Sequence, residues 1–276
     1  MQERNNLLRF LLFMILLFGA ILSILPIIWM FLTSIKPMDE VFTYPPKWLP
    51  SRIVLSNYIE AWKEAPWERY FLNSIFYSGS VIIGQVITSL LAGYAFSKLQ
   101  FRGRDLLFIL YIGTMMIPGQ VTIVPIFVIL SKLKWIDTYQ GLIVPGLTTA
   151  FGTFLFRQFF VSIPTDLQEA ALVDGASHLY ILRKIFVPLS RPAIITLVVF
   201  TFMGTWNDFF WPLIVTNSTE MRTVQIGLTA FQSQYGGVQW SYMMAAAMFV
   251  TLPIIVLYLF AQRYFVEGIT LTGLKG

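Results

Sequence analysis

Long stretches without a charged residue constrain this chain more than any other feature of its sequence. The 26 residues between Arg9 and Lys36 carry no charge, and neither do the 28 residues between Arg69 and Lys98. Similar stretches recur along the rest of the chain. A helix crosses the hydrocarbon core of a bilayer with about 20 apolar residues. The stretches therefore predict several membrane-spanning helices.

Composition excludes the common soluble classes. Of the 276 residues, 57% are hydrophobic and 12% are charged, whereas an average soluble domain is about 25% charged. The chain has no cysteine and one histidine, so disulfides, cysteine metal sites and histidine-rich metal clusters are excluded. The formal net charge of +5 is better explained by cationic loops at a membrane surface than by binding to nucleic acid.

The predicted fold is an all-α membrane protein that forms a single transmembrane domain over residues 1–276. A β-barrel would need alternating segments of about ten residues, and the apolar stretches do not alternate. The six predicted spans lie near residues 10–34, 71–97, 106–131, 139–160, 192–215 and 242–262. An even number of spans places both termini on one side. The short loops on that side carry the excess of Lys and Arg, which predicts cytoplasmic termini.

A few residues inside the predicted spans could contact a substrate. They are Gln85, Trp206, Asn207 and Asp208, and we take them as substrate-cavity candidates. A carboxylate within a span costs about 2.5–3.5 kcal/mol on insertion scales, so Asp208 should face a cavity, a partner or the interface. Aromatic rings beside amide and carboxylate groups are typical of carbohydrate sites. The alternative interpretation is a structural polar pair beside a helix break.

Two short helices are predicted in the loop over residues 162–190. Thr165 and Gln168 have the spacing of a capping box, which predicts a helix from residue 166. Gly175 can end that helix in the left-handed conformation, and Ser177 can cap a second helix that Pro188 would end. No residue pattern in the loop indicates catalysis. A pair of helices joined at a glycine suits docking in a groove of another protein.

These residues also carry a family resemblance. The run Glu169-Ala170-Ala171-x-x-Asp174-Gly175-Ala176, with Ile185-x-x-Pro188 after it, resembles the cytoplasmic coupling loop of binding-protein-dependent ABC importer permeases of the MetI-like type. Val187 stands where that family usually has leucine. The run 206–212 resembles the fifth span of the maltose and multiple-sugar branch. The C-terminal run 268–276 resembles the tail of the second permease subunit in that branch.

The resemblance implies a set of partners. A homologous second permease pairs with this chain in the cytoplasmic membrane of a bacterium or archaeon, and each permease docks its loop on a cytoplasmic ATPase dimer. An extracytoplasmic substrate-binding protein contacts the outer loop, here 217–240, and the tail, here 265–276, reaches toward the ATPase interface. The positions that match the family's ATPase-docking residues are Glu169, Ala170, Ala171, Asp174 and Gly175.

The predicted function is that of a permease subunit that moves a sugar or oligosaccharide by alternating access. The chain has no P-loop motif, so we expect ATP and Mg²⁺ on the partner ATPase, no cofactor on this chain and no enzymatic activity. One alternative keeps this architecture and imports glycerol phosphate or a polyol phosphate. A remote alternative is an ion-coupled secondary transporter, for which Asp208 would be the coupling group.

Overall fold

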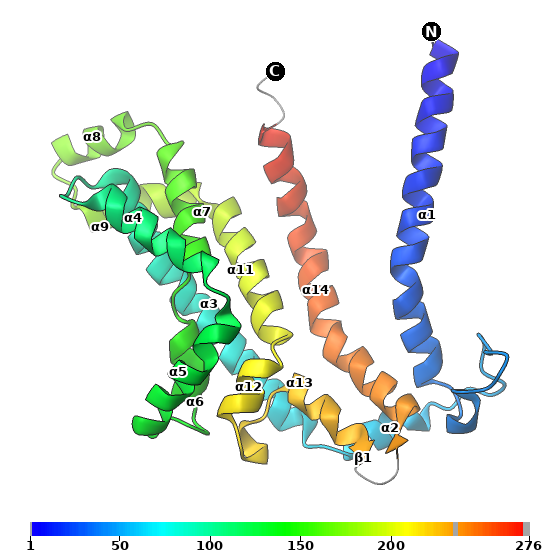
Figure 1. Ribbon diagram of the computed structural model, residues 1–276. Coiled ribbons are helices and arrows are strands. Elements are labelled where there is room, and N and C mark those ends of the chain that lie inside the picture. Colours follow the sequence, from blue (N-terminus) through cyan, green and yellow to red (C-terminus); the bar gives the residue numbers. More distant parts are fainter. Residues whose placement is uncertain (1, 234–236, 273–276) are drawn as a thin grey trace. The chain divides into compact units, whose positions relative to one another are not determined.

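A computed structural model describes residues 2–233 and 237–272 of the chain (Figure 1). The described residues are mainly helical and form two compact units. One unit lies within Met1–Trp67 and Gly227–Pro253, and the other within Glu68–Ile226 and Ile254–Gly276. The predicted helical fold class is therefore confirmed.

The first unit is built from long apolar helices and the connection between α1 and α2. Its elements are α1 (Gln2–Ser34), α2 (Ser56–Lys63), the strands β1 (Gln232–Ser233) and β2 (Gly237–Val238), and the start of α14 (Trp240–Thr272). The two strands pair antiparallel, with Gln232 opposite Val238. Trp67 is buried in this unit, where its ring stacks on Phe231 at 6.2 Å between centroids.

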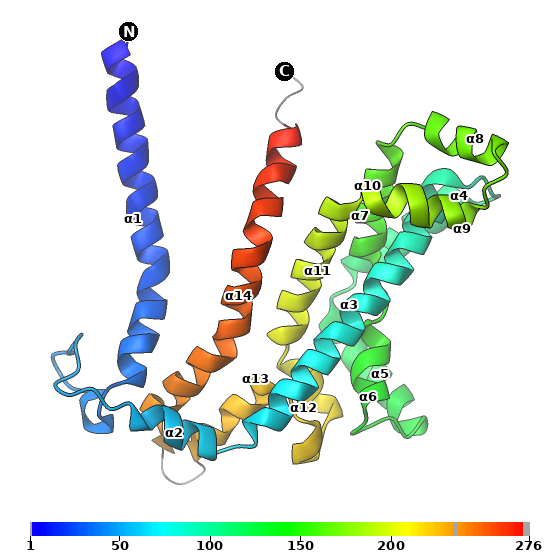
Figure 2. The same ribbon diagram turned by 180° about the vertical axis from the view of Figure 1, so that it is seen from behind.

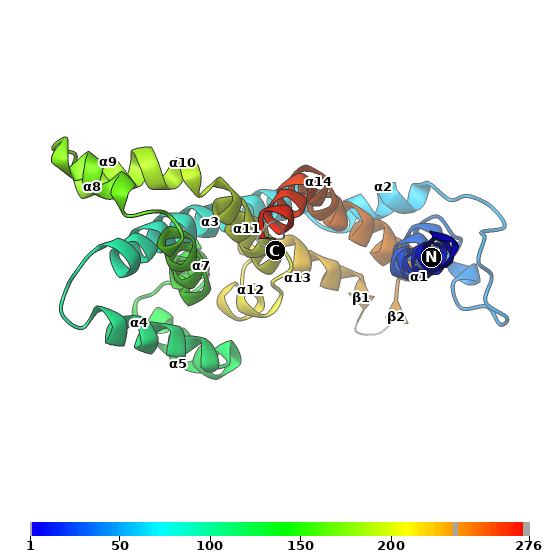
Figure 3. The ribbon, with the colours of Figure 1, turned by 90° about the horizontal axis from the view of Figure 1, so that it is seen from above.

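The second unit contains the remaining helices. They are α3 (Trp67–Lys98), α4 (Arg104–Gly113), α5 (Gly119–Lys132), α6 (Tyr139–Ile143), α7 (Ala150–Val161), α8 (Asp166–Val173), α9 (His178–Ile181), α10 (Val187–Leu189), α11 (Arg191–Trp206), α12 (Phe210–Val215) and α13 (Val224–Gly227). Within this unit α7 lies between the row formed by α9 and α10 and the pair formed by α4 and α5 (Figure 3).

Three helices of the described residues are long and apolar enough to cross a membrane. They are Arg9–Ser34, Trp67–Lys98 and Trp240–Phe260. Two bent pairs raise the number to five if each pair counts as one span: Arg104–Met116 with Gly119–Lys132, bent by 99°, and His178–Leu189 with Arg191–Trp206, bent by 79°. The count of six spans stays a prediction.

Several predicted spans are interrupted where the sequence carries helix breakers. The residue before Pro118, Ile117, is extended (φ −85°, ψ 115°), as expected because proline disfavours the helical conformation in the residue before it. The predicted span 139–160 is divided between α6 and α7, and the predicted span 192–215 is interrupted between Trp206 and Phe210. Each of these breaks lies inside a span that was predicted as continuous.

Helix α3 packs closely on the segment from α6 to α7. A Cβ atom added at Gly93 would lie 2.6 Å from the Cβ of Phe156, and one added at Gly84 would overlap the side chain of Leu147. The Thr88 hydroxyl donates to the Leu147 carbonyl at 3.0 Å. Gly84 and Thr88 belong to a run of small residues at every fourth position, which is typical of close helix contacts.

Candidate functional site

The loop between α7 and α11 folds into two short helices. Helix α8 begins at Asp166, Gly175 adopts a left-handed conformation (φ 80°), and the Ser177 side chain accepts a hydrogen bond from the Tyr180 amide at 3.3 Å. These three features agree with the expectations for the start of the first helix, the glycine and the second cap. Glycine is favoured at such a position because it has no Cβ to clash.

The predicted capping box at Thr165 is wrong. Thr165 is itself helical (φ −68°, ψ −27°), and its side chain makes no capping hydrogen bond. The Gln168 side chain instead points toward α3, where its Nε2 donates to the carbonyl of Lys98 at 3.4 Å. A contact to α3 has therefore replaced the local cap, which sequence spacing alone could not reveal.

The second helix ends at Leu189, one residue after Pro188 and close to the predicted end. Residues Leu182–Phe186 form a π-helical turn, and α10 continues through Pro188 to Leu189. Proline cannot donate the backbone hydrogen bond of a helix interior, and a π-helical turn inserts an extra residue beside it. The helix therefore runs on toward Ser190, whose hydroxyl donates to the Phe186 carbonyl at 2.6 Å.

One face of the α8–α9 segment, which we define as residues 163–181, is anchored on the end of α3. Lys98 donates from Nζ to the Ile163 carbonyl at 2.8 Å, and the Tyr94 hydroxyl lies 3.1 Å from Nδ1 of His178. Beneath the segment a core gathers the buried residues Leu90, Tyr94, Phe156, Phe160, Ile163, Ile181, Leu182, Phe186, Ala193 and Leu197. Ala171 packs against this core as a partly buried residue.

The other face of the segment is open. Glu169, Ala170, Asp174 and Gly175 are exposed, and a hollow of about 550 Å³ is lined by Ala171, Asp174, Gly175, Ala176, Ser177 and Tyr180. Large apolar side chains are also exposed, namely Leu167, Leu172, Val173, Leu179 and Tyr180, with Val173 87% accessible. Four of the five predicted docking positions therefore share this open surface, and Ala171 lies at its partly buried edge.

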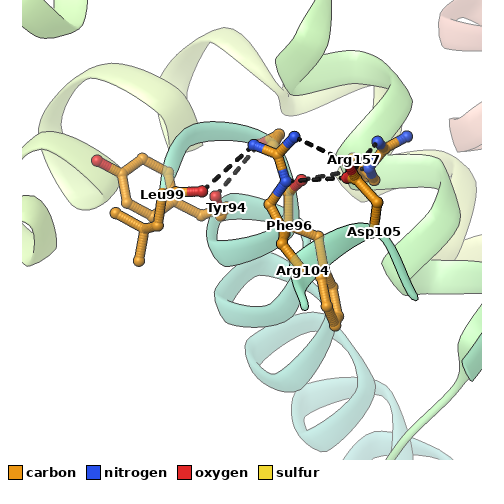
Figure 4. A network of polar contacts seen from close by, with 7 residues as sticks. Tyr94, Phe96, Leu99, Arg104, Asp105 and Arg157 are labelled. Carbon is orange, nitrogen blue, oxygen red and sulfur yellow. Dashed lines mark hydrogen bonds and ion pairs between the residues drawn. The ribbon is translucent and has the colours of Figure 1, made fainter. Parts of the chain in front are cut away.

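A charged cluster lies beside the anchored end of α3. Arg104 donates to the Asp105 carboxylate at 3.0 Å, and the Arg157 guanidinium reaches the same carboxylate at 3.9 Å (Figure 4). Arg157 also donates from Nε to the Phe96 carbonyl at 3.3 Å and lies over the Phe108 ring at 4.1 Å. The cluster thus ties the ends of α3, α4 and α7 together.

A second region with functional potential is a cavity of about 400 Å³ beside α12. Its lining residues are Tyr77, Gly119, Gln120, Thr122, Ile123, Ile126, Leu142, Pro145, Gly146, Asp208, Phe210 and Trp211. Asp208 accepts a hydrogen bond from the Tyr77 hydroxyl at 3.2 Å and another from the Trp211 amide at 3.2 Å. The carboxylate thus faces the cavity and also caps α12.

The four predicted substrate-cavity residues are not brought together. Gln85 lines a separate hollow of about 250 Å³ and bonds to Gly146 and Thr201. Trp206 is 1% exposed and stacks on Phe202 at 5.2 Å, so it belongs to the core. Asn207 is exposed and accepts from the Gln225 side chain at 3.3 Å. Of the four, Asp208 alone lines the larger cavity, and its partner Tyr77 was not singled out from the sequence.

The segment over residues 217–226 is held by the half-buried side chain of Asp137 and the buried side chain of Asn73. The Asp137 carboxylate accepts hydrogen bonds from the amides of Asn217 at 2.8 Å and Ser218 at 3.0 Å. Burial opposes the ionisation of Asp137, but these donors outweigh it and hold the pKa of the carboxyl below its usual value. Asn73, which is fully buried on α3, donates to the Glu220 and Arg222 carbonyls at 2.7 and 2.8 Å.

Comparison with known proteins identifies the family. Residues 85–271 match the family described as the binding-protein-dependent transport system inner membrane component. The chain belongs to this family. It is therefore a membrane permease of a transport system rather than an enzyme, and the predicted resemblance to binding-protein-dependent permeases of the sugar branch is confirmed.

The permease is similar over nearly its whole length to curated relatives. It is 32% identical over 262 residues to the arabinooligosaccharides transport system permease protein of Halalkalibacterium halodurans, which covers 94% of each chain. It is 34% identical to the trehalose/maltose transport system permease protein of Thermococcus litoralis, with 93% of each chain covered. It is 33% identical to the sn-glycerol-3-phosphate transport system permease protein of Yersinia pestis, with 92% of this chain and 93% of that one covered.

Solved structures agree on the fold. A chain from the crystal structure of a bacterial ABC transporter involved in the import of the acidic polysaccharide alginate matches with a TM-score of 0.84 at 25% identity. The match covers 95% of the permease and 97% of that chain. A chain from the alginate transporter in complex with a pentasaccharide-bound periplasmic protein shares the fold at a TM-score of 0.67 and 17% identity.

Proposed function

We propose that this permease is the second membrane subunit of an ATP-driven importer for a sugar or oligosaccharide. It would pair with a homologous permease, receive substrate from an extracytoplasmic binding protein and present the α8–α9 segment to a cytoplasmic ATPase dimer. Six spans with both termini in the cytoplasm complete this arrangement. Movement of the docked segments on ATP binding would tilt the spans and produce alternating access.

The open face of the α8–α9 segment carries this proposal. It combines exposed large apolar side chains with the small residues Ala170 and Gly175 and the acidic residues Glu169 and Asp174. Contiguous exposed apolar surface with a polar rim marks protein–protein contact sites, and the small residues permit close approach. The other face of the segment is fixed to α3 by Lys98 and Gln168. A rigidly held apolar surface of this kind suits a stable partner.

The relatives include permeases for two classes of substrate, sugars and a polyol phosphate. The arabinooligosaccharide and trehalose/maltose relatives favour a neutral sugar. The sn-glycerol-3-phosphate relative favours the alternative of an anionic polyol phosphate. The cavity beside α12 has Asp208 and no Lys or Arg in its lining, and a carboxylate repels a phosphate group. A sugar or oligosaccharide therefore stays the main proposal, and a polyol phosphate the alternative.

Uptake by the reconstituted transporter tests the proposal. The permease, its partner permease, the ATPase and the binding protein would be placed in vesicles and supplied with radiolabelled sugars and glycerol 3-phosphate. We expect ATP-dependent uptake of a sugar, and reduced uptake for Glu169→Lys. Glu64→Lys, the same charge reversal at the exposed end of α2, serves as the matched control. Uptake of glycerol 3-phosphate alone would favour the alternative, and absence of ATP-dependent uptake would contradict both.

A further inference from the structure

The 217–226 segment is fastened to α3 chiefly through one side chain. The Asn73 amide donates to the Glu220 carbonyl at 2.7 Å and to the Arg222 carbonyl at 2.8 Å, and its oxygen accepts from the Tyr139 hydroxyl at 2.7 Å. Asn73 is fully buried. Both amide protons and the amide oxygen of this side chain are therefore used, and water has no access to replace these bonds.

Two neighbours of Asn73 on α3 hold the same segment. Arg69 donates from Nε to the Glu220 carbonyl at 2.9 Å, and the Ser74 hydroxyl accepts from the Val224 amide at 3.0 Å. All of these bonds run from side chains of α3 to backbone groups of the segment. Such bonds fix the position of the backbone whatever the segment's own side chains contact.

The other end of α3 holds the α8–α9 segment in a similar way. The Lys98 ammonium donates to the Ile163 carbonyl at 2.8 Å, and the Lys98 carbonyl accepts from the Gln168 side chain at 3.4 Å. Tyr94 lies buried one turn earlier, with its hydroxyl 3.1 Å from His178. One helix therefore contacts the 217–226 segment near its start and the α8–α9 segment near its end (Figure 2).

Between these two ends α3 is an unbroken rod. It runs for 32 residues without an internal proline, which corresponds to roughly 48 Å at the rise of an α-helix. Within residues 68–226, all of which the structure describes, the other candidate spans are bent or interrupted. A continuous helix moves as a body, whereas a broken one can absorb motion at its break. α3 is therefore the element suited to join the two segments mechanically.

We propose that Asn73 is a positioning residue that couples the 217–226 segment to the α8–α9 segment through α3. The inference rests on the proposed function, in which the α8–α9 segment follows the ATPase. A displacement of α8–α9 on ATP binding moves α3, and Asn73 carries that displacement to the backbone at Glu220 and Arg222. The position of the 217–226 segment therefore depends on whether nucleotide is bound to the ATPase.

A labelling experiment on the complete transporter tests this coupling. The chain contains no cysteine, so Thr219→Cys and Leu179→Cys each give one site for an environment-sensitive fluorophore once reactive cysteines are removed from the partner chains. Thr219 reports on the 217–226 segment and Leu179 on α8–α9, and both residues are exposed. Fluorescence is compared without nucleotide and after trapping with ATP and vanadate, in lipid nanodiscs.

The variant that carries the test is Asn73→Ala. We expect the nucleotide-dependent change at Thr219→Cys to fall by at least about threefold, within the range for residues that mediate coupling, while the change at Leu179→Cys persists. Ser74→Ala, which loses the single bond to Val224, should reduce the change at Thr219→Cys less strongly. If the Asn73→Ala transporter does not assemble, the coupling role is tested on Ser74→Ala alone. Asn57→Ala is the matched control, because Asn57 is also buried and donates to two backbone carbonyls.

Each remaining outcome has a definite meaning. An undiminished change at Thr219→Cys in the Asn73→Ala transporter would overturn the coupling role. An equal loss in Asn57→Ala would also overturn it, because the effect would then be general loosening. If Leu179→Cys does not respond to nucleotide even with Asn73 present, the proposed docking of α8–α9 fails. The two failures are distinguishable because they concern different labels.

Discussion

The two ends of α3 differ in how much of the neighbouring segment they bury. At the start of the helix, buried Asn73 and Ser74 bond to backbone groups of the 217–226 segment, so these two side chains are paired within the chain. At the end of the helix, Lys98 and Gln168 anchor one face of α8–α9, while Val173 and Leu179 on that segment stay exposed.

The contacts at the start of α3 are made within the chain. The exposed apolar side chains of α8–α9, by our proposal, are covered by a partner protein. Buried polar groups that are paired hold one conformation, because breaking any bond leaves a group without a partner. Exposed apolar side chains carry a free-energy cost in water that association removes. Mutations at the two ends should accordingly differ in kind, affecting stability at the start of α3 and association at its end.

The largest expected effect is on association at α8–α9. Val173→Asp places a charge on a side chain that is 87% exposed and, by our proposal, buried against the ATPase. Charging a central contact costs about 2 kcal/mol or more, so we expect at least tenfold less ATPase to co-purify. Leu49→Asp, at a position 72% exposed on the connection between α1 and α2, should leave the yield unchanged. Equal losses from both variants would argue against the docking role.

The next effect is on stability at the start of α3. Asn73→Ala leaves the Arg222 carbonyl and the Tyr139 hydroxyl without this partner, whereas the Glu220 carbonyl keeps its bond from Arg69. An unsatisfied buried group costs about 1–3 kcal/mol. We expect a lower apparent melting temperature of the purified permease in detergent. Asn217→Ala changes an exposed side chain of the same segment and should stay within about 0.5 kcal/mol. A variant at Asn73 as stable as Asn217→Ala would show that the two ends are alike.

A pair of glycines tests whether α3 is packed tightly between its ends. A Cβ at Gly93 would meet the Phe156 Cβ at 2.6 Å and the Arg157 backbone nitrogen at 3.1 Å. Neither atom can rotate away, so Gly93→Ala should destabilise the permease by about 1–3 kcal/mol. At Gly84 the nearest atom is the tip of the Leu147 side chain, which can adjust. Thermal melts should rank Gly93→Ala as the more harmful change, and the reverse order would contradict a rigid centre.

The smallest effect concerns pH at the 217–226 segment. The pKa of Asp137 is below its usual value in the folded chain, so its contribution is fully present above the unfolded pKa of about 3.9. That contribution is lost as the pH falls through the lower, folded value. Melting temperatures from pH 6 down to pH 3 should fall less for Asp137→Asn than for the unaltered chain. Parallel curves would mean that the carboxylate does not hold this segment.

Local sequence signals predicted local structure well. The left-handed Gly175 and the Ser177 cap depend on neighbours within a few positions, whereas the start of α8 at residue 166 was predicted from a capping box that does not form. Helix breaks were harder to place because proline and glycine recur within the apolar stretches. The contacts that organise the two ends of α3 were not predictable, since Asn73 meets residues 147 and 149 positions away. The same is true of Asp208, which pairs with Tyr77 across 131 positions.

The roles expected of the outer loop and of the tail stay predictions. The predicted outer loop 217–240 includes residues 234–236, which lie outside the described residues, and the predicted tail 265–276 ends in residues 273–276, which do as well. The side chains of the tail likewise lie outside the described set. Contact of the loop with a binding protein and of the tail with an ATPase is proposed from the family resemblance.

Site-specific cross-linking tests the central claim most directly. Ala170→Cys introduces the only thiol into a cysteine-free chain on the exposed face of α8. A short bifunctional reagent applied to native membranes should join this position to the ATPase, and mass spectrometry would identify the adduct. Thr219→Cys, treated identically, should give no ATPase adduct. An ATPase adduct at Ala170→Cys is the result we predict, and its absence from assembled, transport-active complexes would contradict the proposed docking site.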